Sequence, residues 1–274
     1  MKILVTGATG FIGQHVVKRL LLTEHEIVVT SLRANSPFGF GITYIPCDLN
    51  IERDDFYGLF GRPDVLIHLA WGGLPNYGEL FHFERNLWTS YYFLKQMIES
   101  GTRNIVVTGT CFEYGLQEGC LSDDLPALPN TSYGVAKNTL RIFLEQLQKK
   151  IPFDFKWIRL FYLYGEGQSK NSILEQLKTA LQRDDKTFNM SGGEQLRDYL
   201  PVETVAENIV KIALQNKVQG IINNCSGNPI SIRRLVEEYL KRSGKNIELN
   251  LGYYNYNNYE PHAFWGSTKK LDNV

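Results

Sequence analysis

Short apolar runs alternate with longer amphipathic segments over the first 160 residues of the chain. The runs are rich in Val and Ile, as in strands buried on both faces, and the longer segments repeat apolar side chains at helical spacing. Strands are predicted at Lys2–Thr6, Glu26–Thr30, Thr43–Ile45, Val65–Leu69, Asn104–Thr108 and Phe155–Leu160, and helices at Phe11–Leu22, Ile51–Phe60, Leu80–Ser100 and Tyr133–Lys149. This alternation predicts βαβ units, and right-handed crossovers then give an α/β fold with a doubly wound parallel sheet.

The alternation becomes less regular after Gly165. Ser231 stands where it can cap the N-terminus of a helix. The segment Tyr253–Tyr259 is rich in Tyr and Asn and has neither a helical nor a strand period. Further helices are predicted at Asn171–Arg183, Val202–Gln215 and Ile232–Arg242, and further strands at Thr187–Met190 and Gly220–Asn224.

The chain is therefore predicted to have two parts. Residues 1–165, with a return segment at about 202–225, form the sheet domain. Residues 166–201 and 226–274 form a small C-terminal lobe. Because ligands bind at the carboxyl ends of the strands in doubly wound folds, this lobe is predicted to bind the substrate there.

Composition narrows the classes of protein that the chain can belong to. Lys plus Arg and Asp plus Glu both number 29, so no basic surface for nucleic acid and no charge directed at a membrane is expected. The sequence has no apolar run of about 18 residues and no secretory leader pattern at its N-terminus. Its four cysteines show no CxxC spacing and no partnering His pattern, so we expect reduced thiols, no metal site and a cytoplasmic protein.

A glycine-rich turn directly follows the first predicted strand. Gly7, Gly10 and Gly13 permit a tight turn, close approach of the backbone to a pyrophosphate, and close helix packing. The helix that opens at Phe11 and Ile12 points its free N–H groups at such phosphates. The turn therefore predicts a dinucleotide site.

A tyrosine and a lysine share one face of the fourth predicted helix, because Tyr133 and Lys137 are four residues apart. A phenol ordinarily loses its proton near a pKa of about 10. A neighbouring ammonium favours the phenolate and lowers that pKa, so Tyr133 is predicted to exchange a proton near neutral pH. Thr110, which follows the fifth strand, offers a hydroxyl to hold a substrate oxygen as charge develops on it. With a dinucleotide nearby, these residues predict hydride transfer.

Together these features resemble the extended short-chain dehydrogenase/reductase family, in the branch that acts on nucleotide sugars. The glycines have the GxxGxxG spacing, and Thr110 stands five residues before Gly115, as the catalytic Ser or Thr of the family does. Two further segments are similar to the "R-Y-x-N-V-Y-G" and "R-D-Y-I-H-V" motifs of this branch: Arg-Leu-Phe-Tyr-Leu-Tyr-Gly at 159–165 and Arg-Asp-Tyr-Leu-Pro-Val at 197–202. The resemblance implies a Rossmann fold and a homodimer formed through Leu80–Ser100 and Thr131–Lys149.

The resemblance also implies roles for individual residues. The Arg197 guanidinium would grip the nucleotide diphosphate, the alternative being an intramolecular ion pair. Tyr162 stands where the branch has a substrate-contacting Asn. The implied substrate contacts are Thr110, Tyr162 and Arg197. The implied cofactor contacts are Gly7, Gly10, Phe11, Ile12, Gly13, Arg33, Asp48, Leu49, Leu69, Ala70, Thr108, Tyr133 and Lys137.

Arg33 bears on the choice of cofactor. An NAD-selective site usually has an acidic residue at the end of the second strand, whereas an arginine there suits a 2′-phosphate. NADP(H) is therefore favoured, with NAD(H) as the alternative if Arg33 is only a solvated surface residue.

Departures from the family pattern narrow the reaction. The 4,6-dehydratases follow the catalytic threonine with Asp-Glu, where this chain has Cys111 and Phe112, so dehydration is disfavoured. The motifs most resemble reductases of dTDP- or CDP-linked 4-keto-6-deoxyhexoses, which supply sugars for surface polysaccharides such as lipopolysaccharide. The predicted function is thus an NADP(H)-dependent 4-ketoreductase. The alternatives are a nucleotide-sugar 4-epimerase with tightly held NAD and a non-catalytic NADP-binding redox sensor.

Overall fold

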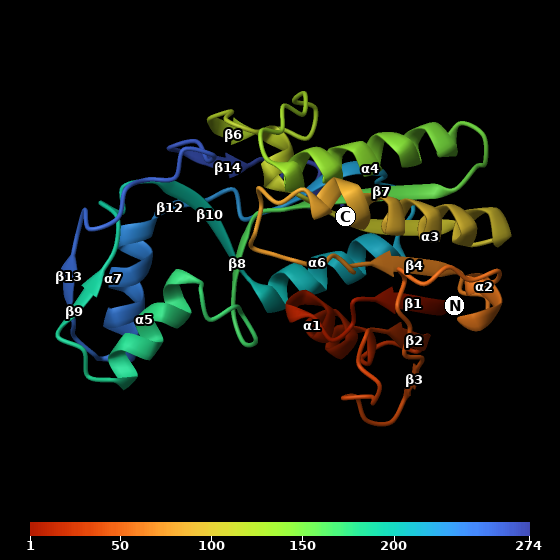
Figure 1. The fold of residues 1–274 in the computed structure, drawn as a ribbon, viewed down its shortest axis with the longest axis horizontal. Helices are drawn as coiled ribbons and strands as arrows, with labels where there is room; N and C mark the ends of the chain where they lie inside the picture. The colour runs from red at the N-terminus through yellow and green to blue at the C-terminus, as the bar shows by residue number, and fades with distance from the viewer.

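A seven-stranded parallel sheet forms the centre of the molecule, in the order β11-β7-β5-β4-β1-β2-β3 (Figure 1). The computed structural model describes all 274 residues. The strands of this sheet are β1 (Lys2–Thr6), β2 (Glu26–Thr30), β3 (Ile42–Tyr44), β4 (Val65–His68), β5 (Asn104–Thr110), β7 (Asp154–Leu160) and β11 (Gly220–Asn224). The predicted doubly wound fold is confirmed.

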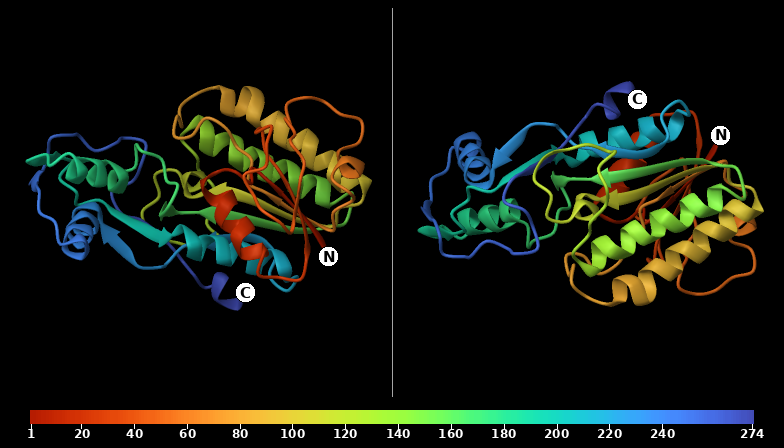
Figure 2. Two further views of the ribbon diagram at one scale, coloured as in Figure 1. Left: turned by 90° about the horizontal axis from the view of Figure 1, so that it is seen from below. Right: turned by 90° about the horizontal axis from the view of Figure 1, so that it is seen from above.

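Helices cover both faces of this sheet (Figure 2). The helices α1 (Phe11–Leu20) and α6 (Val202–Leu214) pack against one face, in a cluster of 19 buried apolar residues. The opposite face is covered by α2 (Phe56–Leu59), α3 (Leu87–Ser100) and α4 (Ser132–Gln148), with a second cluster of 19. Burial of both faces explains why the central strands are almost continuously apolar.

A smaller group of elements stands at one end of the molecule (Figures 1 and 2). Its own cluster of 7 buried residues includes Leu177 of α5, Phe188 of β9 and Val236 of α7. The strands β9 and β13 pair in parallel, and Ser231 caps α7 by accepting from the Arg234 N–H, as predicted. The group contains α5 (Ile173–Gln182), β9 (Thr187–Asn189), α7 (Ile232–Ser243) and β13 (Glu248–Asn250). A substrate-binding role for this region stays a prediction.

Two small sheets connect the smaller group with the central sheet. The first consists of β8 (Tyr162–Tyr164), β10 (Leu196–Pro201) and β12 (Pro229–Ser231). The second pairs β6 (Gly119–Leu121) with β14 (Phe264–Gly266). The chain then returns to the central sheet, and the short 3-10 helix η3 (Leu271–Asn273) packs against its core.

The prediction of a helix at Ile51–Phe60 is mostly wrong, because only the short helix α2 forms, near the end of that range. Asp55 caps α2 by accepting from the Gly58 N–H at 2.6 Å, and residues 51–55 are exposed, so no burial favours an earlier turn. The predicted helix Leu80–Ser100 opens instead with a π-helix, η1 (His82–Asn86). The fifth strand runs on to Thr110 because Gly109 and Thr110 still pair with β7.

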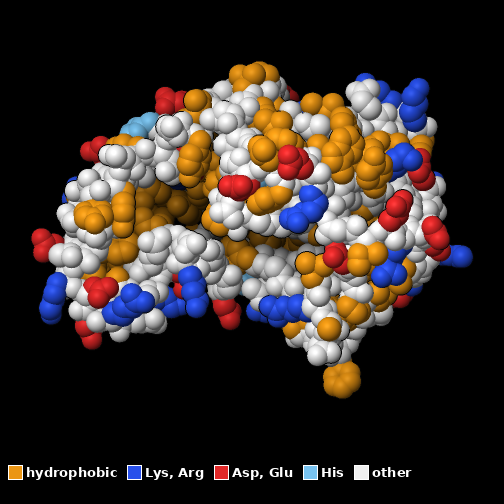
Figure 3. Space-filling view, in the orientation of Figure 1, with side chains coloured by type: hydrophobic (Ala, Val, Ile, Leu, Met, Phe, Trp, Pro, Cys, Tyr) orange, Lys and Arg blue, Asp and Glu red, His pale blue; other side chains and the backbone are white.

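None of the four cysteines forms a disulfide bond. No helix has both the length and the apolar character that crossing a bilayer would require. In the space-filling view, a hollow with hydrophobic side chains in its depth lies beside the smaller group of elements (Figure 3).

Candidate active site

The glycine turn between β1 and α1 forms a tight backbone cradle. Gly7 has a φ of +67°, and a Cβ added to it would lie 2.8 Å from the backbone nitrogen of Ala70. A Cβ on Gly13 would collide with the Gly7 carbonyl oxygen. Gly10 is the N-cap of α1 and offers no side-chain acceptor, so the first N–H groups of the helix remain available to an anion. This cradle fits the pyrophosphate of a dinucleotide.

Arg33 lies exposed just beyond the end of β2. Its backbone N–H donates to the Ser31 hydroxyl at 3.2 Å, and its carbonyl oxygen accepts from the Tyr44 hydroxyl at 2.5 Å. Both contacts use the backbone, so the guanidinium remains free for a 2′-phosphate. Asp48 accepts from the backbone and side-chain nitrogens of Asn50 through one carboxylate oxygen, which leaves the other for a ligand.

The residues after β4 lie against the glycine turn. The Leu69 N–H donates to the Thr6 carbonyl oxygen at 3.3 Å, and Ala70 approaches Gly7 as described. His68 is buried and its Nδ1 lies 2.9 Å from the Thr6 hydroxyl oxygen. Burial, with a smaller contribution from the Lys137 charge, lowers the pKa of His68 to about 3. His68 is therefore neutral and packed, and is not a base.

The structure brings Thr110, Tyr133 and Lys137 together at the carboxyl edge of the sheet. Thr110 ends β5, and Tyr133 and Lys137 lie in the first two turns of α4; all three are buried. The Lys137 Nζ donates to the Thr108 carbonyl oxygen at 2.8 Å. The Tyr133 N–H donates to the Tyr77 carbonyl oxygen at 3.0 Å and fixes the start of the helix. The catalytic roles of the three side chains stay predictions.

The expectation that Lys137 lowers the pKa of Tyr133 is wrong for this structure. Burial raises the pKa of the phenol, and the facing Thr110 hydroxyl only partly opposes that rise. Burial also lowers the pKa of Lys137 to about 7, against the opposing charge of Glu113. Desolvation therefore dominates both groups. The phenol is protonated at neutral pH, which suits a proton donor.

A buried carboxylate that the sequence did not single out holds Thr110 in place. Glu113 is fully buried and accepts from the Thr110 N–H, from the indole N–H of Trp157 and from the Arg159 Nε, each at 2.9 Å. The Thr110 hydroxyl in turn accepts from the Phe112 N–H at 3.2 Å, which completes a capping box. Because Glu113 is fully occupied in this network, it is not available to act on a substrate.

Aromatic rings surround Tyr133. The ring centroids of Tyr77 and Phe112 lie 4.5 Å apart in a stacked pair, and that of Tyr77 lies 5.6 Å from that of Tyr133. Tyr259 stacks on Phe112 at 6.2 Å. On the cofactor side, the Trp71 ring centroid lies 4.0 Å from the Lys137 Nζ. No local sequence pattern marks Trp71, Tyr77 or Tyr259, because each reaches the site only through tertiary folding.

Arg197 forms the intramolecular ion pair that was the alternative to a phosphate contact. It is buried and donates to Glu260 at 2.8 Å and to the His262 carbonyl oxygen at 3.1 Å. Its guanidinium carbon lies 4.8 Å from the ring centroid of Phe264. The hydroxyl of neighbouring Tyr162 is buried without a hydrogen-bond partner. Roles for Arg197 and Tyr162 in substrate binding stay predictions.

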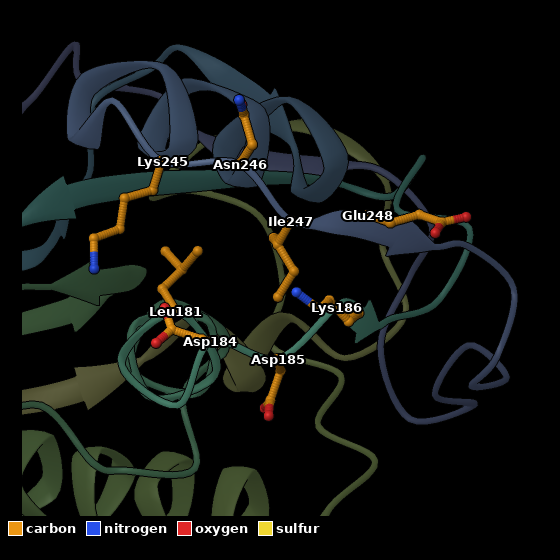
Figure 4. A pocket seen from close by; sticks show the side chains of 8 residues that line it. All are labelled: Leu181, Asp184, Asp185, Lys186, Lys245, Asn246, Ile247 and Glu248. Carbon is orange, nitrogen blue, oxygen red and sulfur yellow. The ribbon is translucent and has the colours of Figure 1, made fainter.

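A separate cavity of about 570 Å³ opens in the smaller group of elements (Figure 4). It lies between the end of α5 and the segment before β13. None of the predicted site residues lines this cavity. Its lining is mostly polar and consists of Leu181, Asp184, Asp185, Lys186, Lys245, Asn246, Ile247 and Glu248. This cavity is therefore distinct from the site around Tyr133.

Comparison with known proteins identifies the family. The NAD dependent epimerase/dehydratase family matches residues 3–225. The chain is 31% identical over 271 residues to dTDP-6-deoxy-L-talose 4-dehydrogenase (NAD(+)) of Aggregatibacter actinomycetemcomitans, covering 97% of this chain and 100% of the relative. It is 26% identical to UDP-glucose 4-epimerase of Bacillus subtilis, over 90% of this chain and 84% of that protein.

A solved structure shows the same fold. UDP-N-acetylglucosamine 4-epimerase from Methanobrevibacter ruminantium matches with a TM-score of 0.89 at 21% identity, over 99% of this chain and 90% of that chain. The family match and the relative from Aggregatibacter confirm the resemblance inferred from the motifs. The chain belongs to the NAD dependent epimerase/dehydratase family, within the extended short-chain dehydrogenases/reductases that modify nucleotide sugars.

Proposed function

We propose that this protein reduces the C4 ketone of a dTDP- or CDP-linked 4-keto-6-deoxyhexose to an alcohol, using a nicotinamide dinucleotide. The main support is the convergence of Thr110, Tyr133 and Lys137 at the strand edge beside the glycine cradle. The name of the relative from Aggregatibacter specifies oxidation at C4 of a dTDP-linked 6-deoxyhexose. That reaction is the reverse of the one proposed here, because hydride transfer between a ketone and an alcohol is reversible. The product would be an activated deoxysugar for surface polysaccharides.

Each site residue has a separate role in the proposed reduction of the ketone. When bound, the cofactor supplies the hydride that C4 accepts. The Thr110 hydroxyl donates a hydrogen bond to the C4 oxygen as negative charge develops on it. Tyr133 gives its proton to that oxygen, and the raised pKa of the buried phenol keeps this proton in place until it is needed. The Lys137 ammonium stabilises the phenolate that remains.

The choice of cofactor depends on the end of β2. The free guanidinium of Arg33 favours NADP(H), since it offers a fork of donors to a 2′-phosphate. The relative from Aggregatibacter is named for NAD(+). We propose NADP(H) for this chain, and a comparison of NADPH with NADH at equal concentrations tests it.

The surroundings of Tyr133 favour a deoxysugar and disfavour dehydration. Phe112 and Tyr77 present ring surfaces beside the reacting position, where a C6 methyl group packs without leaving a hydroxyl unpaired. Cys111 is buried, and burial raises the pKa of its thiol, so it holds its proton. Cys111 and Phe112, which stand where the dehydratases carry Asp-Glu, therefore supply no acid and base for eliminating water.

A product assay tests the proposed function. The protein is incubated with NADPH or NADH and dTDP-, CDP-, GDP- or UDP-linked 4-keto-6-deoxy sugars, and the products are identified by NMR. One cofactor oxidised for each C4 alcohol formed supports the proposal. Copurifying NAD, with interconversion of C4 epimers and no net cofactor use, would instead establish the epimerase.

We also propose a homodimer formed through α3 and α4. Trp88 and Tyr92 on α3 are 42% and 62% exposed, and their rings lie 5.9 Å apart. Ile142 on α4 is 39% exposed. Such an exposed apolar surface is typical of an interface. Light scattering measures the mass directly, and Tyr92→Glu is expected to give monomers.

A further inference from the structure

The ion pair between Arg197 and Glu260 is buried on the substrate side of the site. The two side chains are only 5% and 14% exposed, and the Arg197 Nη2 donates to one Glu260 oxygen at 2.8 Å. Glu260 lies in the 251–263 segment, which connects β13 to β14 without forming a helix or strand (Figure 1). The Glu260 carboxylate therefore comes from a long connecting segment, whereas Arg197 lies in strand β10.

The ion pair lies next to the reacting position. The Arg197 guanidinium carbon lies 5.7 Å from the ring centroid of Tyr162 and 4.8 Å from that of Phe264. Phe264 belongs to the same buried cluster as Tyr133. The buried Tyr162 hydroxyl has no hydrogen-bond partner, so a donor is available beside the carboxylate. A negative group placed here therefore meets a guanidinium and an unpartnered phenol.

The 251–263 segment contacts the site through a few long-range interactions. The Tyr259 ring lies 6.2 Å from the rings of both Phe112 and Tyr77. The Asn130 amide donates to the Tyr259 carbonyl oxygen at 3.3 Å, and the His262 N–H donates to the Glu118 carboxylate at 3.0 Å. The end of the segment is fixed, because the Leu196 N–H of β10 donates to the His262 carbonyl oxygen at 3.0 Å. A shift is therefore confined to the residues before His262.

Glu260 contacts the guanidinium through a single nitrogen. A diphosphate has more oxygens and more negative charge than one carboxylate, and a guanidinium can engage it through two parallel hydrogen bonds. A diphosphate is therefore the stronger partner for Arg197. The Arg197 Nη1 already donates to the Leu196 and His262 carbonyl oxygens, so a diphosphate must engage Nη2, the nitrogen that Glu260 holds.

We propose that Glu260 competes with the substrate diphosphate for Arg197, so that Glu260 and the residues before it move aside on binding. This inference rests on the proposed function, in which the substrate is a nucleoside diphosphate sugar. Glu260 thus lowers the affinity for every nucleotide that needs the Arg197 guanidinium, and lowers it by the same factor for each.

Calorimetric titration of dTDP, UDP and dTMP into three variants tests the inference. Glu260→Gln removes the competing charge and retains the length of the side chain. Glu260→Asp retains the charge and shortens its reach, so the inference can still be tested if the Gln variant does not fold. Glu194→Gln is the matched control, because Glu194 is exposed and its carboxylate lies 3.3 Å from the Tyr256 hydroxyl of the same segment, away from Arg197.

Glu260→Gln is expected to bind dTDP or UDP about tenfold more tightly than the wild type, the scale of one hydrogen bond to a charged group. The affinity for dTMP should rise by no more than that for dTDP, since removing the competitor helps most the ligand that needs Arg197. Glu260→Asp should lie between the two proteins, and Glu194→Gln should match the wild type. Unchanged or weaker binding by both Glu260 variants, while the wild type binds dTDP or UDP, overturns the inference alone. If no nucleotide binds any of the proteins, the proposed function fails and the inference fails with it.

Discussion

Replacing Glu113 with Gln tests whether the buried network below Thr110 holds the site together. The carboxylate accepts from three donors, on Thr110, Trp157 and Arg159. A Gln side chain has only one acceptor oxygen and turns an NH2 group toward a donor. The Glu113 and Arg159 side chains are 0% and 1% exposed, so water cannot replace the lost partner.

The expected cost follows from this burial. Removing one partner of a buried ion pair costs about 3–5 kcal/mol, because the other charge is left uncompensated. Both terminal nitrogens of Arg159 already lack hydrogen-bond partners, so the remaining charge has no second acceptor. We therefore expect Glu113→Gln to lose about 3–5 kcal/mol in the free energy of unfolding, by the same principle. Turnover should also fall, since the Thr110 N–H loses the acceptor that fixes its position.

Urea unfolding measures the change, with the slope of the transition checked against the wild type. Glu237→Gln is the matched control, because it breaks an ion pair with Arg233 whose side chains are 53% and 49% exposed. Such a pair contributes about 0.3–0.5 kcal/mol. The double variant Glu113→Gln/Arg159→Met should recover part of the loss. A loss below about 1 kcal/mol for Glu113→Gln would refute the reasoning.

The remaining predictions concern the chemistry. Tyr133→Phe is expected to reduce turnover by roughly 10² with little change in cofactor binding, because it removes only the donated proton; near-normal turnover in a folded variant would exclude Tyr133 as the donor. Arg33→Ala should weaken NADPH by about 1.5 kcal/mol or more and leave NADH unaffected, and equal losses would contradict a phosphate contact. Because burial lowers the pKa of Lys137 to about 7, its ammonium is lost as pH rises through 7, so kcat/KM for reduction should fall above that pH. Lys137→Arg should flatten this profile, since a guanidinium stays protonated. Incubation with dTDP-glucose or CDP-glucose should give no 4-keto-6-deoxy product, and the alkaline absorbance of that ketone would reveal one.

The sequence predicted those features that depend on neighbouring residues. The strands β1 and β2 have their predicted bounds because each is a compact apolar run, and β11 also has its predicted bounds. The helix α4 begins one residue earlier than expected. The short strands β8 and β10 were missed because their partners are distant, as in the pairing of Tyr162 with Tyr199. The same distinction holds for the site. The pairing of Tyr133 with Lys137 was predicted because the two are close in sequence, whereas Glu260 was missed as the partner of Arg197 because the two are 63 positions apart. The predicted pKa of Tyr133 was wrong because the phenol is buried by rings that are distant in the sequence, those of Trp71, Tyr77, His82 and Phe112.

The 251–263 segment is anchored at both ends. On one side β13 pairs with β9, and on the other β14 pairs with β6 before Leu271 and Val274 pack against the core. Glu260 is therefore a tethered anion with a fixed effective concentration at Arg197, of about millimolar order or above for a short tether. Dilution of the protein does not weaken such a competitor. An insertion that lengthens this segment, or a substitution that stiffens it, should thus shift nucleotide affinity without changing any residue that contacts the nucleotide.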